Sequence, residues 1–89
     1  MEFTEETVAD VTNRLKRVEG QVRALQAMVQ EGRDCREVVT QLTAATKALE
    51  RAGFVLIAAG LTWCLEDPER SAAAGYELAD VQKMFTKLA

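Results

Sequence analysis

Two cysteines, Cys35 and Cys64, are the residues of this 89-residue chain whose chemistry stands out. The sequence contains no histidine, which removes the commonest metal ligand and the usual general base at neutral pH. In a reducing compartment, two thiols are more typical of redox chemistry or of a soft-metal site than of a structural disulfide. Zinc usually takes about four protein ligands in a structural site, whereas two thiolates can bind Cu(I).

Both cysteines fall at the ends of one predicted helix, 34–65. They are 29 residues apart, roughly 43 Å along a straight helix, so they cannot meet within it. If a second copy packs antiparallel about a two-fold axis near Leu49 and Glu50, Cys35 lies near Cys64 of the partner subunit, twice per dimer. The alternatives are therefore a dimer with two inter-subunit dithiol sites, or two unrelated thiols that pack as small apolar residues.

A cluster of basic residues on the first predicted helix is the second chemical feature. Positions 14–23 contain four basic residues and one acidic residue, and two more basic residues follow near the middle of the next predicted helix. These basic residues are Arg14, Lys16, Arg17, Arg23, Lys47 and Arg51. Lysine and arginine bind DNA phosphates with little sequence discrimination. The pattern predicts a nucleic-acid face, and the alternative is an ordinary solvated helix face.

Composition and charge limit the other functions. The net charge of −3 does not by itself indicate a nucleic-acid partner. No nucleophile–base pair, motif-placed carboxylate pair or glycine-rich phosphate loop is present, so we do not predict an enzyme. The acidic start, MEFTEET, does not resemble a signal peptide, and the longest nearly apolar run, 52–65, is too short to cross a bilayer. We therefore expect a cytoplasmic protein with no membrane partner.

The spacing of apolar residues predicts an all-α fold with three helices, at about 5–31, 34–65 and 72–88, in a single domain over 1–89. The first helix repeats apolar residues in three–four alternation: Val8, Val11, Leu15, Val18, Val22, Leu25 and Val29. The second helix repeats small or apolar residues in the same way from Cys35 to Trp63. We expect Gly32 to end the first helix and Asp34 with Glu37 to form a capping box for the second.

The second helix is apolar on more than one side, so a single hairpin would leave part of its surface uncovered. This predicts an antiparallel four-helix dimer core built from two copies of the first two helices. The third helix would cover an edge or join two dimers into a tetramer. Gly53 and Gly60 lie seven residues apart in the second helix, and we expect them to allow close packing of another helix.

A resemblance to a known family covers nearly the whole chain from about Val11. The segment over 14–42 reads RLKRVEGQVRALQAMVQEGRDCREVVTQL. Together with the apolar helix that ends at Cys64, it resembles the copper-sensing repressor family of the CsoR and RcnR types. The resemblance implies a three-helix protomer, a dimer of dimers, and operator DNA that is released when the sensing site is filled. The resemblance also implies that two arginines used by this family for DNA binding correspond to Arg14 and Arg51.

The copper sensors of this family place Cys, His and Cys across the dimer interface. Here those positions read Cys35, Gly60 and Cys64, so the imidazole is missing. This departure is similar to the CstR-type branch, which senses persulfides. The nickel/cobalt branch requires histidines and is excluded by composition, and the formaldehyde branch does not fit Cys64 with a missing histidine.

The sequence therefore predicts a DNA-binding repressor, with no cofactor, that senses persulfide or polysulfide. A persulfide donor would modify Cys35, whose thiolate is favoured by the helix N-terminus and by Arg36. Cys64 of the partner subunit would then attack, and a di- to tetrasulfide bridge would force release of operator DNA. The first alternative is a Cu(I) sensor that uses Cys35 and Cys64 as its two thiolates. The second is a helical interaction module with incidental thiols.

Overall fold

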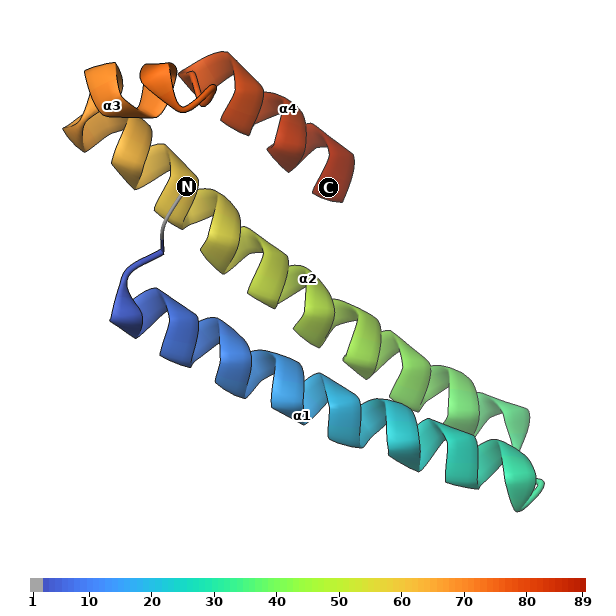
Figure 1. Ribbon diagram of the computed structural model, residues 1–89. Coiled ribbons are helices and arrows are strands. Elements are labelled where there is room, and N and C mark those ends of the chain that lie inside the picture. The colour runs from blue at the N-terminus through green and yellow to red at the C-terminus, as the bar shows by residue number, and fades with distance from the viewer. Residues whose placement is uncertain (1–2) are drawn as a thin grey trace.

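The computed structural model describes residues 3–89 as four helices: α1 (Glu5–Gln30), α2 (Cys35–Glu66), α3 (Pro68–Ala73) and α4 (Leu78–Leu88). No strand occurs within this part of the chain. Figure 1 shows α1 and α2 as a long antiparallel hairpin, with α3 and α4 folded back over the C-terminal half of α2. The prediction of an all-α fold is confirmed.

The ends of α1 follow from its local sequence. The Thr4 hydroxyl accepts a hydrogen bond from the Thr7 N–H at 3.1 Å, and Glu5 and Glu6 fall in the first turn, where the helix dipole favours carboxylates. After Gln30 the chain turns at Gly32, whose φ of 71° is a conformation that glycine adopts without steric cost. The predicted range 5–31 is therefore within one residue of α1.

Helix α2 begins with a different cap from the one predicted. Asp34 Oδ1 accepts from the Arg36 N–H at 2.8 Å, as an N-cap residue should. Glu37, however, accepts a hydrogen bond from Arg33 Nε at 3.0 Å in place of the capping-box bond that we expected. The nearby guanidinium offers the carboxylate a charge-assisted partner, and this wins over a neutral backbone N–H. The N-cap itself is unaffected, and α2 still begins one residue after Asp34.

The hairpin closes on one narrow buried stripe. Val11 and Val18 of α1 face Ala45 and Ala52 of α2, and all four side chains are buried. The small alanines allow the two helices to approach closely over much of their length. Only one of the two apolar rows of α1 is buried in this way. The other row, which includes Val8 and Leu15, stays exposed.

The predicted third helix, 72–88, is wrong in its first part. Pro68 begins the short helix α3 at a position where its missing N–H costs nothing, and the Asp67 side chain accepts from the Arg70 N–H at 3.3 Å. A turn at Gly75, with φ of 88°, separates α3 from α4. Glu77 and Asp80 then form a capping box, so α4 begins at Leu78 rather than near residue 72.

Helix α4 packs onto α2 through the two glycines that the sequence singles out. A Cβ added at Gly53 would lie 2.5 Å from Leu88 Cδ2, and one added at Gly60 would lie 3.6 Å from both methyl carbons of Val81. Val81 is only 1% exposed. From Gly53 to Gly60 the residue number rises by seven along α2, whereas it falls by seven along α4 from Leu88 to Val81. Helix α4 therefore lies antiparallel along α2. The expectation that these glycines permit close helix packing is confirmed.

The protomer is thin and elongated. Its principal extents are 54 × 25 × 14 Å, and its radius of gyration is 16.8 Å, compared with about 12 Å for a compact domain of this length. A 14 Å thickness corresponds to a single layer of helices. One layer cannot enclose a hydrophobic core, so one face of the hairpin retains exposed apolar side chains.

By length and composition, α2 is long and apolar enough to cross a membrane, although only 22% of its most apolar window is buried in the protomer. The core helix of a soluble protein passes the same test. Three charged residues, Lys47, Glu50 and Arg51, fall in the middle of α2. These charges lie at the N-terminal end of the apolar half of α2, and the exposed rows of this helix have the heptad spacing that a partner helix buries.

Candidate functional site

Cys35 is the first residue of α2, and its side chain is exposed. It begins a heptad row that continues through Leu42, Leu49 and Leu56, which therefore share one side of the helix. Leu42 and Leu49 are each about half exposed. The thiol of Cys35 thus lies at the edge of an apolar surface that nothing in the protomer covers.

Cys64 is in a different environment, because its side chain is only 7% exposed. Its thiol donates a weak hydrogen bond from Sγ to the Tyr76 carbonyl oxygen at 3.7 Å. The Tyr76 ring packs against Trp63, with ring centroids 5.8 Å apart. The turn between α3 and α4 therefore lies directly over this thiol.

The two thiols are free and lie at opposite ends of α2, so a single protomer cannot join them. Among residues 3–89, no cluster of three or more His, Cys, Asp or Glu side chains could hold a metal ion. Gly60, one turn before Cys64, brings no ligand either and packs against Val81. Any site that uses both sulfurs must therefore be formed between two protomers.

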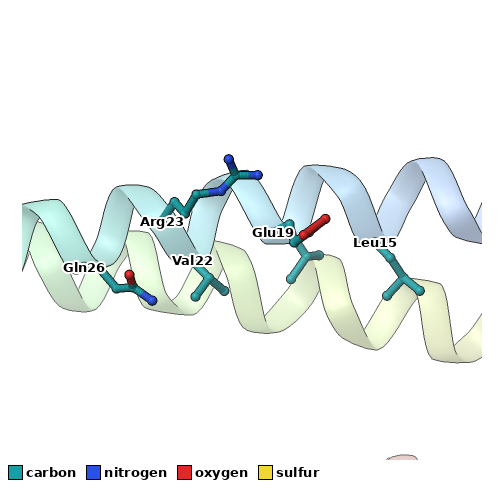
Figure 2. Close-up of a pocket in the computed structure, with 6 residues that line it drawn as sticks. Leu15, Glu19, Val22, Arg23 and Gln26 are labelled. Carbon is teal, nitrogen blue, oxygen red and sulfur yellow. The ribbon is translucent and has the colours of Figure 1, made fainter.

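The exposed apolar side chains of α1 and α2 line two shallow grooves on the side of the hairpin where Leu15 and Leu42 lie. One, of about 470 Å³, is lined by Leu15, Val18, Glu19, Val22, Arg23 and Gln26. Figure 2 shows Leu15 and Val22 on the same side of α1, with Arg23 directed away from them. The other, of about 430 Å³, spans from Val22 and Val29 of α1 to Leu42 of α2. The grooves show that the exposed heptad rows of α1 and α2 form one continuous surface.

The structure places the basic residues that we predicted to bind DNA on two different sides of the α1–α2 hairpin. Lys16, Arg17, Lys47 and Arg51 are exposed, and Arg14 is half-buried. Arg14 and Arg51 lie on the side of the buried stripe opposite to Leu15 and Leu49, with Arg17 one turn from Arg14 and Lys47 one turn from Arg51. Lys16 is about 200° around α1 from Arg14 and so faces a different direction.

Arg14 has a partner that the sequence reasoning missed. Its Nε donates to Asp10 Oδ1 at 2.8 Å, one turn earlier on α1. The spacing of four residues between opposite charges on a helix was the available signal. Tyr76 and Val81 were missed as neighbours of Cys64 and Gly60 for another reason, because they come from the region whose helix boundary was wrong.

We call the surface formed by Arg14, Arg17, Lys47 and Arg51 the basic face.

Comparison with known proteins gives a consistent result. The family model for "Metal-sensitive transcriptional repressor" matches residues 7–87. The copper-sensing transcriptional repressor CsoR of Bacillus subtilis is 40% identical over 80 residues, which cover 86% of this chain and 79% of CsoR. The copper-sensing transcriptional repressor RicR of Mycobacterium tuberculosis is 40% identical over 67 residues, which cover 75% of this chain and 67% of RicR.

Two solved structures have the same fold. The copper-sensing repressor CsoR with Cu(I) from Geobacillus thermodenitrificans superposes with a TM-score of 0.80 at 29% sequence identity, covering 98% of this chain and 91% of that one. The nickel-responsive transcriptional regulator InrS superposes with a TM-score of 0.76 at 32% identity, and each chain is covered completely.

Proposed function

The chain belongs to the family of metal-sensitive transcriptional repressors, which are not enzymes, and from this premise we propose that it represses transcription through an inter-subunit dithiol. In this proposal two protomers pair antiparallel, Cys35 of each meets Cys64 of the partner subunit, and a ligand that joins the two sulfurs releases operator DNA. The observation that carries the proposal is the exposed apolar row that begins at Cys35.

The dimer is supported by the surface that the protomer leaves open. Half-exposed apolar residues follow heptad spacing on both long helices, and they are Val8, Leu15, Val22 and Val29 of α1 with Leu42 and Leu49 of α2. Such rows are what a coiled-coil interface buries. A second hairpin on this face would complete a four-helix core, and a two-fold axis near Leu49 would bring opposite ends of α2 together.

Cu(I) is the inducer that the relatives support. The resemblance to the CstR-type branch favours persulfide over Cu(I), and the relatives reverse this order, because CsoR and RicR are both copper-sensing repressors. The donor set fits this metal ion, since thiolates are soft ligands. Cys35 and Cys64 of the partner subunit would hold Cu(I) as its two ligands, without the imidazole that the resemblance implies for copper sensors.

Persulfide is the second candidate, and the observation that favours it is Gly60. This position is buried against Val81 and supplies no third ligand. A Cys35 thiolate would take the outer sulfur of a persulfide donor and release the donor as a thiol. Attack by Cys64 of the partner subunit on the Cys35 persulfide then forms a disulfide and releases hydrogen sulfide. If both thiols carry persulfides, the same loss of hydrogen sulfide leaves a trisulfide.

The basic face would bind the operator through phosphates. Lys47 and Arg51 lie level with the proposed two-fold axis but on the side of α2 opposite to Leu49, so pairing two protomers places one basic face on each outer surface of the dimer. Two dimers would form a tetramer through apolar side chains that the dimer leaves exposed, among them Phe54 and Phe85, whose rings lie 5.7 Å apart. A repressor that must reach DNA acts in the cytoplasm of a bacterial cell.

One titration tests the proposal and separates the two inducers. Operator affinity of the reduced protein is measured by fluorescence anisotropy with increasing Cu(I), and separately with polysulfide, and intact masses are recorded after each. Release by Cu(I) with an unchanged denatured mass supports the metal sensor, whereas release with a covalent dimer carrying bridging sulfur supports the persulfide sensor. The Arg14→Ala, Arg51→Ala double variant should lose DNA binding, and unchanged binding would remove the basic face from the proposal.

A further inference from the structure

The segment 68–88, made of α3, α4 and their connecting turn, contacts α2 at three successive places. Leu88 lies on Gly53, Val81 lies on Gly60, and the Tyr76 carbonyl lies on the Cys64 thiol. The contacts run antiparallel along α2, and they end at the thiol. Figure 1 shows the segment folded back over this half of the helix.

We propose that segment 68–88 is a lid over Cys64, and that it must lift from α2 before this thiol can react or bind a metal ion. This inference rests on the proposed function, because it adds a control to the same dithiol. The thiol is 7% exposed with the lid in place. Its Sγ lies 3.7 Å from the Tyr76 oxygen, so the turn occupies one side of the sulfur.

The lid buries little apolar surface, although the rings of Tyr76 and Phe85 pack against Trp63 and Phe54 of α2. Val81 is its one fully buried apolar side chain, whereas Leu78, Met84 and Phe85 are each more than 40% exposed. The thiol–carbonyl hydrogen bond is weak, because sulfur is a poor donor. Segments with little buried apolar surface open at low free energy, and this segment therefore opens more readily than the α1–α2 hairpin.

The turn itself is rigid, so the lid moves as a unit. The Tyr76 N–H donates to the Ser71 carbonyl at 2.8 Å, and Ser71 is 2% exposed. Gly75 supplies the positive φ that closes the turn. Lifting α4 therefore carries the Tyr76 carbonyl away from Cys64. By linkage, a ligand that is bonded to Cys64 only in the open state also holds the lid open.

The test measures how fast N-ethylmaleimide alkylates Cys64, by peptide mass spectrometry, relative to the same thiol in guanidinium-unfolded protein. In the wild-type protein Cys64 should react at least about tenfold more slowly than when unfolded. Gly60→Val places two methyl groups against Val81 and should remove most of this protection. Adding Val81→Ala removes two methyl groups from α4, so the two changes together add only one carbon, and the double variant should regain the protection.

Gly20→Val is the matched control, since Gly20 lies within α1 with nothing near its added Cβ, and it should leave Cys64 protection unchanged. Val81→Ala alone provides a second arm, because it removes the lid's buried side chain without creating a clash, and it should speed alkylation. Wild-type Cys64 that reacts as fast as in the unfolded protein would overturn the lid. So would unchanged rates in both Gly60→Val and Val81→Ala.

These alkylation rates involve neither DNA nor an inducer, so they stand apart from the proposed function. Failure of the dithiol sensor would instead be seen as a Cys35→Ala variant that still releases the operator when Cu(I) or polysulfide is added.

Discussion

Arg14 donates from Nε to Oδ1 of Asp10 at 2.8 Å, so one arginine of the basic face is already engaged by a carboxylate in the free protein. Both side chains are partly exposed, at 37% and 48%. An ion pair of this kind contributes little to stability. In the proposed complex its importance is for binding, because a phosphate would compete with Asp10 for the Nε of Arg14.

Replacement of Asp10 by Asn should tighten operator binding. The change frees Arg14 and removes a negative charge from beside the phosphates, and we expect an affinity gain of several-fold at low salt. The measurement is fluorescence anisotropy over a series of salt concentrations, with Arg14→Ala as the opposite case. Each lost phosphate contact should lower the salt slope by about one. An unchanged salt slope in both the Asp10→Asn and the Arg14→Ala variants would mean that Arg14 does not contact DNA.

Leu49→Glu should prevent dimer formation. Leu49 is 51% exposed in the protomer and lies nearest the proposed two-fold axis, so the variant brings two carboxylates together in an apolar interface. Analytical ultracentrifugation should show monomer where the wild-type protein is a dimer or larger. Thr43→Glu adds the same charge on the outer side of α2 and should leave the assembly intact. A Leu49→Glu protein that still dimerises would place the interface elsewhere.

Mixed dimers provide a test of the antiparallel arrangement. Cys35→Ala and Cys64→Ala proteins should each bind operator DNA and fail to respond to inducer. A dimer with one copy of each retains a Cys35 on one protomer and a Cys64 on the other, and these two residues form one complete site. Co-expression with different affinity tags should therefore restore about half of the inducer uptake per dimer. No recovery in the purified mixed dimer would argue against a site that joins Cys35 to Cys64 of the partner subunit.

Replacement by alanine should have opposite effects on the free energy of unfolding at Gly20, which lies within α1, and at Gly32, which follows this helix. Gly20→Ala should stabilise the protein by about 0.5–1 kcal/mol, because the position is helical and nothing lies near the added methyl group. Gly32→Ala should destabilise it by about 1–2 kcal/mol, because φ is 71° there. Urea unfolding monitored by circular dichroism compares both variants at one protein concentration. Equal effects would contradict the assigned backbone conformation at Gly32.

The two long helices could be predicted from sequence because their limits depend on local chemistry. Asp34 and Gly32 act on their own backbone neighbours, and those contacts need no distant partner. The predicted start of the third helix, at residue 72, was wrong for a related reason, which concerns Pro68. A proline ends one helix and is equally suited to begin another, and the choice depended on the Asp67 cap.

The candidate site could be predicted only in part. Heptad spacing identified both apolar rows of α1, but it could not distinguish the row that packs on α2 from the row left for a second copy. Val11 and Val18 are buried, whereas Val8 and Leu15 are half exposed, although all four follow the same alternation. The contact between Tyr76 and Cys64 depends on how a turn folds back over α2, and a one-dimensional pattern holds no information on this.

The 14 Å thickness of the protomer has a consequence for its lifetime in the cell. A newly made copy exposes its apolar rows until another copy covers them, so in the proposed dimer the stability of the folded protein rises with protein concentration. At low synthesis rates more chains are unpaired, and unpaired chains are the species that proteases degrade. The abundance of this protein should therefore fall more steeply than its rate of translation.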